Sequence, residues 1–150
     1  ELRNAVGPAP SLQHVRDTVI RIRAGKGMVV DAKDPDSRSA GSFFVNPIVP
    51  ADVADTVSAR FAAETVPQWP NSDGVKLSAA WLIQHSGMGK GYGDGRVGLS
   101  SKHTLALVNR GGATASELLT FASHVQERVR SATGIALVME PRVLGLQAGS

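Results

Sequence analysis

The sequence predicts an α+β domain in which helices pack on one small mixed or antiparallel sheet. Helical and strand-like segments are interspersed without the strict alternation that builds a doubly wound parallel sheet, and the strand candidates are short. With 150 residues and 42% hydrophobic side chains, the chain is long enough to bury one core. We therefore expect a single domain over 1–150, with a leading helix and linker at 1–28 and its core at 40–145.

After a loop-like segment at 6–10, the sequence predicts a helix that is followed by a second loop. Ser11 is suited to cap the helix, and apolar residues recur after it at helical spacing as far as Ile22, before Gly25 ends the pattern. The segment 26–39 starts apolar and then becomes polar and rich in turn-forming residues, so we expect a loop in its second half.

A strand and two helices come next. Residues 43–49 are rich in strand formers, although Pro47 limits this strand to an edge or an irregular position. Apolar residues spaced by four predict a helix over 51–63. Two prolines and a glycine break the chain after it, and Ser78 is then suited to cap a short helix at 79–83.

A glycine-rich loop over 87–95 leads into two strands, predicted at 97–100 and 105–108. Within this region, Gly93-Asp-Gly-Arg-Val-Gly98 matches the glycine pattern of dinucleotide-binding folds letter for letter. That pattern binds a pyrophosphate where a strand turns into a helix. Here the glycines follow a helix and lead into a strand, so we interpret them as a flexible connection.

The longest helix is predicted near the end of the chain. Thr114 and Glu117 form a capping box at its start, a continuous apolar stripe follows, and Gly134 ends it. A last strand is predicted over 135–138.

Composition excludes several classes of protein. There is no run of about 20 apolar residues for a membrane helix and nothing that resembles a signal peptide, so we expect a cytoplasmic protein without membrane insertion. The chain has no cysteine, and its four histidines lack metal-ligand spacing, so we expect no metal centre. A net charge of +3 suits an anionic partner, but scattered aromatic residues and no basic stripe argue against nucleic-acid binding.

Three polar residues are candidates for chemistry, and their spacing alone leaves each role open. A serine such as Ser42 can deliver a proton to a carbanion from a dry pocket, or simply bond its own loop. His103 stands at the entrance to an apolar strand, where a surface histidine without a function is the simpler interpretation. Glu140 follows the strand predicted at 135–138 and can serve as a general acid, a substrate orienter or an arginine partner.

Four segments carry a resemblance to a known family. They are Ile22-Arg-Ala-Gly-Lys-Gly-Met28, Ala40-Gly-Ser-Phe-Phe-Val-Asn-Pro-Ile-Val49, 76–83 with Gly87, and 97–109. Gly-Ser-Phe-Phe-x-Asn-Pro is the most specific of these motifs. In this order the segments resemble the carboxy-terminal half of the UDP-N-acetylenolpyruvoylglucosamine reductases (MurB), flavoenzymes of peptidoglycan precursor synthesis. The long helix and the tail 140–145 extend the resemblance over nearly the whole chain.

The resemblance implies an activity for the complete protein. In this family NADPH reduces bound FAD, and the reduced flavin passes a hydride to UDP-N-acetylglucosamine enolpyruvate, giving UDP-N-acetylmuramate. The family's proton donor matches Ser42, and the glutamate that stabilises the intermediate matches Glu140. Where the family commonly has Leu-Glu-Pro-Glu-Val-Arg, this chain has Leu137-Val-Met-Glu-Pro-Arg142, and Pro141 favours an extended backbone at Glu140 that re-aims its side chain.

The resemblance also implies residues that bind the substrate. Asn46 matches the motif asparagine that the family turns toward its substrate, and His103 falls on a position that often contacts the nucleotide. Arg23 and Lys26 resemble a basic pair that serves the diphosphate.

The family's amino-terminal half has no counterpart in this sequence. That half supplies the FAD-binding domains and a catalytic arginine, and the chain starts at Glu1 rather than at a methionine. We therefore expect the missing FAD domains as partners, and neither flavin absorbance nor NADPH oxidation from this chain alone. Two alternatives stay open: a non-catalytic nucleotide-binding module, which would leave Ser42 and Glu140 without a role, and a basic nucleic-acid-binding domain, whose binding would fall steeply with salt.

Overall fold

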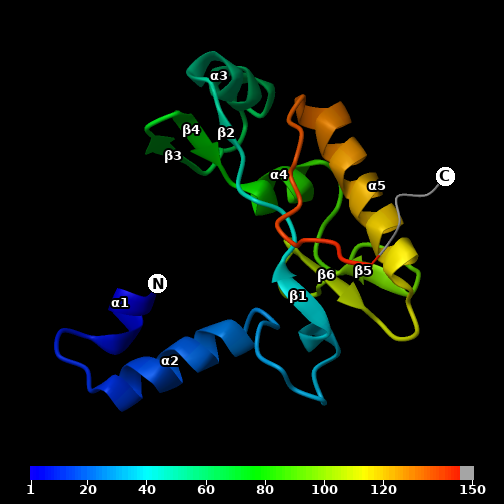
Figure 1. Cartoon of the computed structure of the whole chain (residues 1–150). Helices are drawn as coiled ribbons and strands as arrows, with labels where there is room; N and C mark the ends of the chain where they lie inside the picture. Colours follow the sequence, from blue (N-terminus) through cyan, green and yellow to red (C-terminus); the bar gives the residue numbers. More distant parts are fainter. Residues whose placement is uncertain (146–150) are drawn as a thin grey trace.

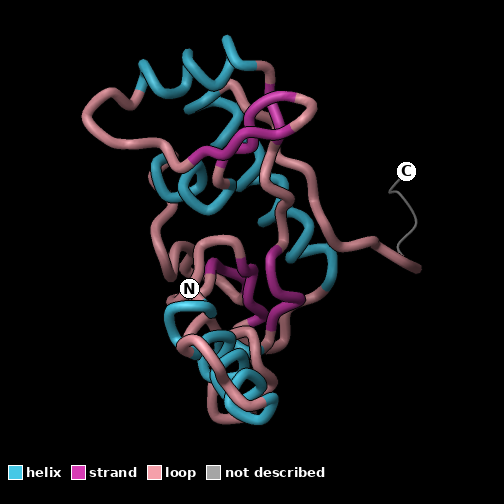
Figure 2. The backbone as a smooth tube through the Cα atoms, turned by 90° about the vertical axis from the view of Figure 1, so that its left-hand side faces the viewer, coloured by secondary structure: helices cyan, strands magenta, loops and turns pink. Residues whose placement is uncertain are grey.

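The computed structural model describes residues 1–145, which form α-helices and two separate antiparallel sheets of three strands. The first sheet has the strand order β1-β6-β5, and the second has the order β2-β4-β3. The strands are β1 Ser39–Ser42, β2 Ile48–Val49, β3 Gln68–Asn71, β4 Gly74–Leu77, β5 Val97–Leu99 and β6 Ala106–Asn109. Figures 1 and 2 show the two sheets in separate parts of the molecule. The α+β class is confirmed, whereas the expectation of one sheet is wrong.

The chain crosses from the first sheet to the second through residues 43–47, where a strand was predicted. Phe44 makes only an isolated bridge to Met139, and β2 begins at Ile48. The prediction of a strand at 135–138 is also wrong, because this segment pairs only with the short crossing segment 43–47 and forms no ladder with it. Ile135 and Leu137 are nevertheless buried in an extended segment.

Three strands, β1, β3 and β4, lie outside the predicted strands. The hairpin of β3 and β4 was interpreted as a break because it contains Pro70 and Gly74, but β3 is an edge strand, which tolerates a proline. The strand β1 has the sequence Ser-Ala-Gly-Ser, which carries no strand preference of its own and depends on its pairing with β6.

The predicted helix caps are confirmed. Ser11 accepts a hydrogen bond from the amide of His14, and Ser78 accepts one from the amide of Trp81. Thr114 and Glu117 form the full capping box. The α-helices are α1 Leu2–Val6, α2 Leu12–Ala24, α3 Ala51–Arg60, α4 Ala79–His85 and α5 Ala115–Thr133, and a short 3₁₀ turn, η1, covers Pro35–Ser37 within the predicted loop.

One hydrophobic cluster connects both sheets with α4 and α5. Phe44, Leu82, Leu107 and Val125 are each at most 1% exposed within it. The pair of α1 and α2 lies beside this body (Figure 1), and Leu12 of the predicted apolar stripe is 90% exposed. The helix at 12–24 is therefore confirmed, but its stripe does not contribute to the core.

Residues 1–145 contain neither a candidate membrane span nor a candidate metal cluster. No helix in this range is both long and apolar enough to cross a membrane. No group of three or more histidine, aspartate or glutamate side chains in the same range is arranged to hold a metal ion.

Candidate functional site

Three of the predicted site residues line one cleft of about 420 Å³, which we call the serine cleft. Ser42, Asn46 and Glu140 come from three separate parts of the sequence, and Lys76 of β4 joins them. The remaining lining is formed by Phe44, Val45, Ile48 and Leu105. The cleft thus combines a hydroxyl, an amide, a carboxylate and an ammonium group.

Backbone pairing brings these residues together. The amide of Phe43 donates to the carbonyl oxygen of Leu105 at 2.8 Å, and on its other side the amide of Glu140 donates to the carbonyl oxygen of Phe43 at 3.0 Å. The amide of Val45 donates to the carbonyl oxygen of Val138 at 2.9 Å. The extended backbone expected before Pro141 agrees with this pairing.

The two phenylalanines of the motif anchor the cleft in the core. Phe43 and Phe44 are 4% and 1% exposed, and their rings meet edge to face with centroids 5.5 Å apart. Ser42 and Asn46, on either side of this anchor, face the cleft. The motif therefore separates into residues that hold the backbone and residues that line the site.

Asn46 has a structural contact as well as a place in the cleft. Its Oδ1 accepts a hydrogen bond from the amide of Ala79, the first residue of α4, at 2.9 Å. Since Oδ1 is used in this way, the Nδ2 group is the part of Asn46 that can donate to a ligand.

Sequence reasoning missed Lys76. In β4 it lies opposite Ile48 of β2 and Trp69 of β3, and its half-buried side chain reaches the serine cleft. The only signal in the sequence was its place at the start of the 76–83 segment. Without the pairing of β2 with β4, nothing indicates that this lysine lies near Glu140.

A second cleft, of about 560 Å³, is lined by other residues, and we call it the basic cleft. Its cationic side chains are Arg21, Lys26, Lys90 and Lys102, and it also holds His103. Thr104 lines the basic cleft and the next residue, Leu105, lines the serine cleft.

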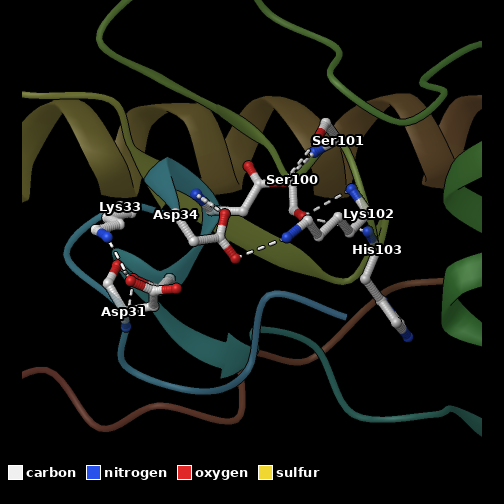
Figure 3. A network of polar contacts seen from close by, with 9 residues as sticks. Asp31, Lys33, Asp34, Ser100, Ser101, Lys102 and His103 are labelled. Atoms are coloured by element: carbon white, nitrogen blue, oxygen red, sulfur yellow. Dashed lines mark hydrogen bonds and ion pairs between the residues drawn. The ribbon is translucent and has the colours of Figure 1, made fainter. Parts of the chain in front are cut away.

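His103 presents a neutral donor to the basic cleft. Its Nδ1 accepts a hydrogen bond from the amide of Leu105 at 3.1 Å, which leaves the proton of the neutral ring on Nε2. Burial, followed by the charges of Lys26 and Lys90, lowers the pKa of His103 below its usual value. Its ring points away from the neighbouring polar contacts (Figure 3).

Two of the lysines in the basic cleft are paired with carboxylates. Lys26 Nζ lies 2.7 Å from Glu1 Oε2, and Lys102 Nζ lies 2.7 Å from Asp34 Oδ2. The contact between Lys102 and Asp34 raises the pKa of the lysine and lowers the pKa of the aspartate. Lys90 has no ion pair within residues 1–145, so it contributes an uncompensated charge to the cleft.

Arg23 lies apart from Lys26. It lines a smaller cleft of about 250 Å³ with Ala40 and Gly41, directly before Ser42, whereas Lys26 lines the basic cleft. The two residues predicted to bind the diphosphate therefore line different clefts.

The glycine-rich segment does not fit a dinucleotide such as FAD. The guanidinium of Arg110 donates to the carbonyl oxygens of Gly91, at 2.8 Å, and of Gly93. A Cβ atom at Gly98 would collide with this guanidinium. The segment therefore surrounds an arginine of the chain itself instead of presenting amides to a pyrophosphate, as we expected from its position before a strand.

Comparison with known proteins identifies similar sequences. Residues 34–144 match the family model described as "UDP-N-acetylenolpyruvoylglucosamine reductase, C-terminal domain". A UDP-N-acetylenolpyruvoylglucosamine reductase of Thermobifida fusca is 51% identical over 146 residues, which cover 93% of this chain and 41% of the relative. The reductase of Mycobacterium marinum is 51% identical over 134 residues, covering 87% and 36%, and that of Corynebacterium diphtheriae is 50% identical over 143 residues, covering 93% and 38%. The chain spans about two fifths of the length of these relatives.

Proposed function

This chain belongs to the UDP-N-acetylenolpyruvoylglucosamine reductase family, in which it matches the carboxy-terminal domain, and we propose that it forms the substrate-binding and proton-donating part of such an enzyme. The substrate of the complete protein is UDP-N-acetylglucosamine enolpyruvate, and the product is the peptidoglycan precursor UDP-N-acetylmuramate. We assign this reaction to the cytoplasm.

The observation that supports the proposal is that neighbouring residues, Thr104 and Leu105, line two chemically different clefts. Serine, asparagine and glutamate side chains lie in one cleft, and four cationic side chains line the other. A nucleotide sugar fits such a pair of clefts, because its diphosphate favours lysines and a neutral hydrogen-bond donor like those of the basic cleft. We propose that the diphosphate binds near Lys26, Lys90 and His103, and that the enolpyruvyl ether extends over the boundary at Thr104 and Leu105 toward Ser42.

The residues of the serine cleft match the needs of a reduction by hydride. When a hydride adds to one carbon of the enolpyruvyl double bond, the π electrons move to the other carbon and into the adjoining carboxylate. We propose that Ser42 gives its hydroxyl proton to that carbon and then regains a proton from solvent. Glu140 stabilises the intermediate, and the ammonium of Lys76 offsets the negative charge on the enolate and on the serine oxygen.

We assign the flavin and the reductant to a part of the complete enzyme other than this domain. FAD supplies the hydride in this family, after reduction by NADPH, and no dinucleotide fits the glycine-rich segment because Arg110 occupies it. We accordingly propose that the chain alone binds the nucleotide sugar but neither absorbs as a flavoprotein nor oxidises NADPH. The same proposal divides the chain into a leading segment, 1–28, and a core, 40–145. It also includes a contact of this domain with FAD-binding domains.

Separating the two half-reactions tests the function. In a complete reductase that contains this chain, Ser42→Ala is expected to leave reduction of the flavin by NADPH intact and to slow product formation by about 10²- to 10⁴-fold, the usual contribution of a general acid. Stopped-flow absorbance follows the two steps separately. Equal loss of both steps, or an unchanged product rate, would contradict the role of Ser42.

A further inference from the structure

Asp36 occupies a buried position behind the basic cleft. It lies in η1, where its amide donates to Asp34 Oδ1 at 3.1 Å, and it is 8% exposed. Its Oδ2 accepts two hydrogen bonds from Ser101, at 3.1 Å from the amide and at 2.6 Å from the hydroxyl. A buried carboxylate needs such partners to offset its desolvation.

The loop fastened by Asp36 is the loop that carries His103. Ser100 Oγ accepts hydrogen bonds from the amides of Lys102, at 3.0 Å, and of His103, at 3.2 Å, so residues 100–103 are bonded into one unit. The ion pair between Lys102 and Asp34 fastens this unit a second time. Figure 3 shows Lys102 directed at Asp34 while the ring of His103 is directed away from both.

Asp36 also touches the turn that carries Lys26. Gly27 is buried in a left-handed conformation, with φ of 67°, and a Cβ atom there would lie 2.9 Å from the Cβ of Asp36. Only glycine combines this conformation with so close an approach. The amide of Met28 donates to the carbonyl oxygen of Arg23 at 2.9 Å, which ties the turn to the end of α2.

From these contacts we propose that Asp36 is a positioning residue of the basic cleft, holding the Lys26 turn and the His103 loop at the separation that a nucleoside diphosphate requires. Asp36 does not itself line the basic cleft, and it acts through Gly27 on one side and Ser101 on the other. This inference rests on the proposed function, because it gives the cleft its ligand.

The test uses Ser101→Ala, which removes one contact to Asp36 without changing a charge. We expect UDP affinity, measured by calorimetry on the 150-residue chain, to fall about 3- to 10-fold as the His103 loop loosens. NMR titration of the His103 ring adds a readout that global destabilisation would not move. Release from burial and from Lys26 and Lys90 should raise its pKa toward the usual value. The other charged groups lining the cleft, Glu1, Arg21 and Lys102, remain present in the variant.

Ser131→Ala is the matched control. Ser131 Oγ donates to Glu127 Oε1 at 3.1 Å on the exposed surface of α5, so this variant also loses a serine-to-carboxylate bond, but far from the cleft in sequence. We expect wild-type UDP affinity and a wild-type His103 titration from it. Asp36→Asn, which keeps one acceptor oxygen, should fall between wild type and Ser101→Ala in both measurements.

The outcomes separate the inference from the function. If Ser101→Ala remains folded by circular dichroism and the titration of His103 is unchanged, Asp36 does not position the loop and the inference is overturned. If the wild-type chain does not bind UDP but His103 still titrates differently in the variant, the proposed function fails while the positioning role is supported.

Discussion

The two clefts are built in different ways. In the serine cleft, backbone hydrogen bonds along 43–45 hold the reactive side chains beside one another, and buried aromatic rings anchor that segment. In the basic cleft, contacts between side chains hold the lining residues: the hydrogen bond of Ser101 to Asp36 and the ion pair of Lys102 with Asp34. The groups that we propose to react are thus positioned by backbone pairing, whereas the groups that we propose to bind the diphosphate depend on polar contacts that single substitutions remove.

The largest expected effect is on the anchor of the serine cleft. Phe44→Ala should lower the free energy of unfolding by about 3–5 kcal/mol, because it removes a large side chain that is 1% exposed. Urea unfolding measures this change. Val138→Ala is the control from the paired segment, since Val138 is 65% exposed and its loss should cost under about 0.5 kcal/mol. Similar losses in both variants would refute the idea of a core anchor.

The next effect distinguishes the two clefts by their lysines. Lys90→Gln removes an uncompensated charge from the basic cleft and should weaken UDP binding about tenfold, as for the loss of one charge-assisted hydrogen bond. Lys76→Gln changes the serine cleft and should leave UDP binding unaltered while slowing reduction by the complete enzyme. Calorimetry with UDP gives the first comparison. An equal loss of affinity in both variants would mean that the clefts do not divide the substrate as proposed.

The smallest expected effect is on the pH dependence of folding stability, and it involves only the basic cleft. The pKa of His103 is lowered in the folded chain, so the unfolded chain binds more protons between the usual pKa near 6.5 and the lowered value. Stability from this group is therefore present above about pH 6.5 and decreases as the pH falls through the folded pKa. Thermal unfolding of wild type and His103→Gln over this range should show a steeper loss for wild type. Parallel profiles would argue against a buried neutral His103.

Local features of the fold could be predicted from the sequence, but features made by pairing could not. The caps at Ser11, Ser78 and Thr114 depend on neighbours three residues away, and all were predicted. The strand β1 depends on its pairing with β6, and the hairpin of β3 and β4 belongs to a sheet completed by β2. The low strand propensity of Pro70 therefore predicted a break where the structure has a strand.

The candidate site divides in the same way. Ser42, Asn46 and Glu140 were identified by family resemblance, while spacing alone left the roles of Ser42 and Glu140 open, and only the tertiary pairing brings the three into one cleft. Lys76 was missed because β2 and β4 meet only in the folded chain. Arg23 and Lys26 are close in sequence, yet they line different clefts because α2 ends at Ala24 and the chain turns before Lys26.

The central claim is that one nucleotide sugar spans both clefts, and backbone NMR of the 150-residue chain tests it most directly. Titration with UDP should shift the amides around Lys26 and His103, and titration with UDP-N-acetylglucosamine should shift these and also the amides around Asn46. A silent spectrum with both ligands, or shifts confined to surfaces away from the two clefts, would contradict the account.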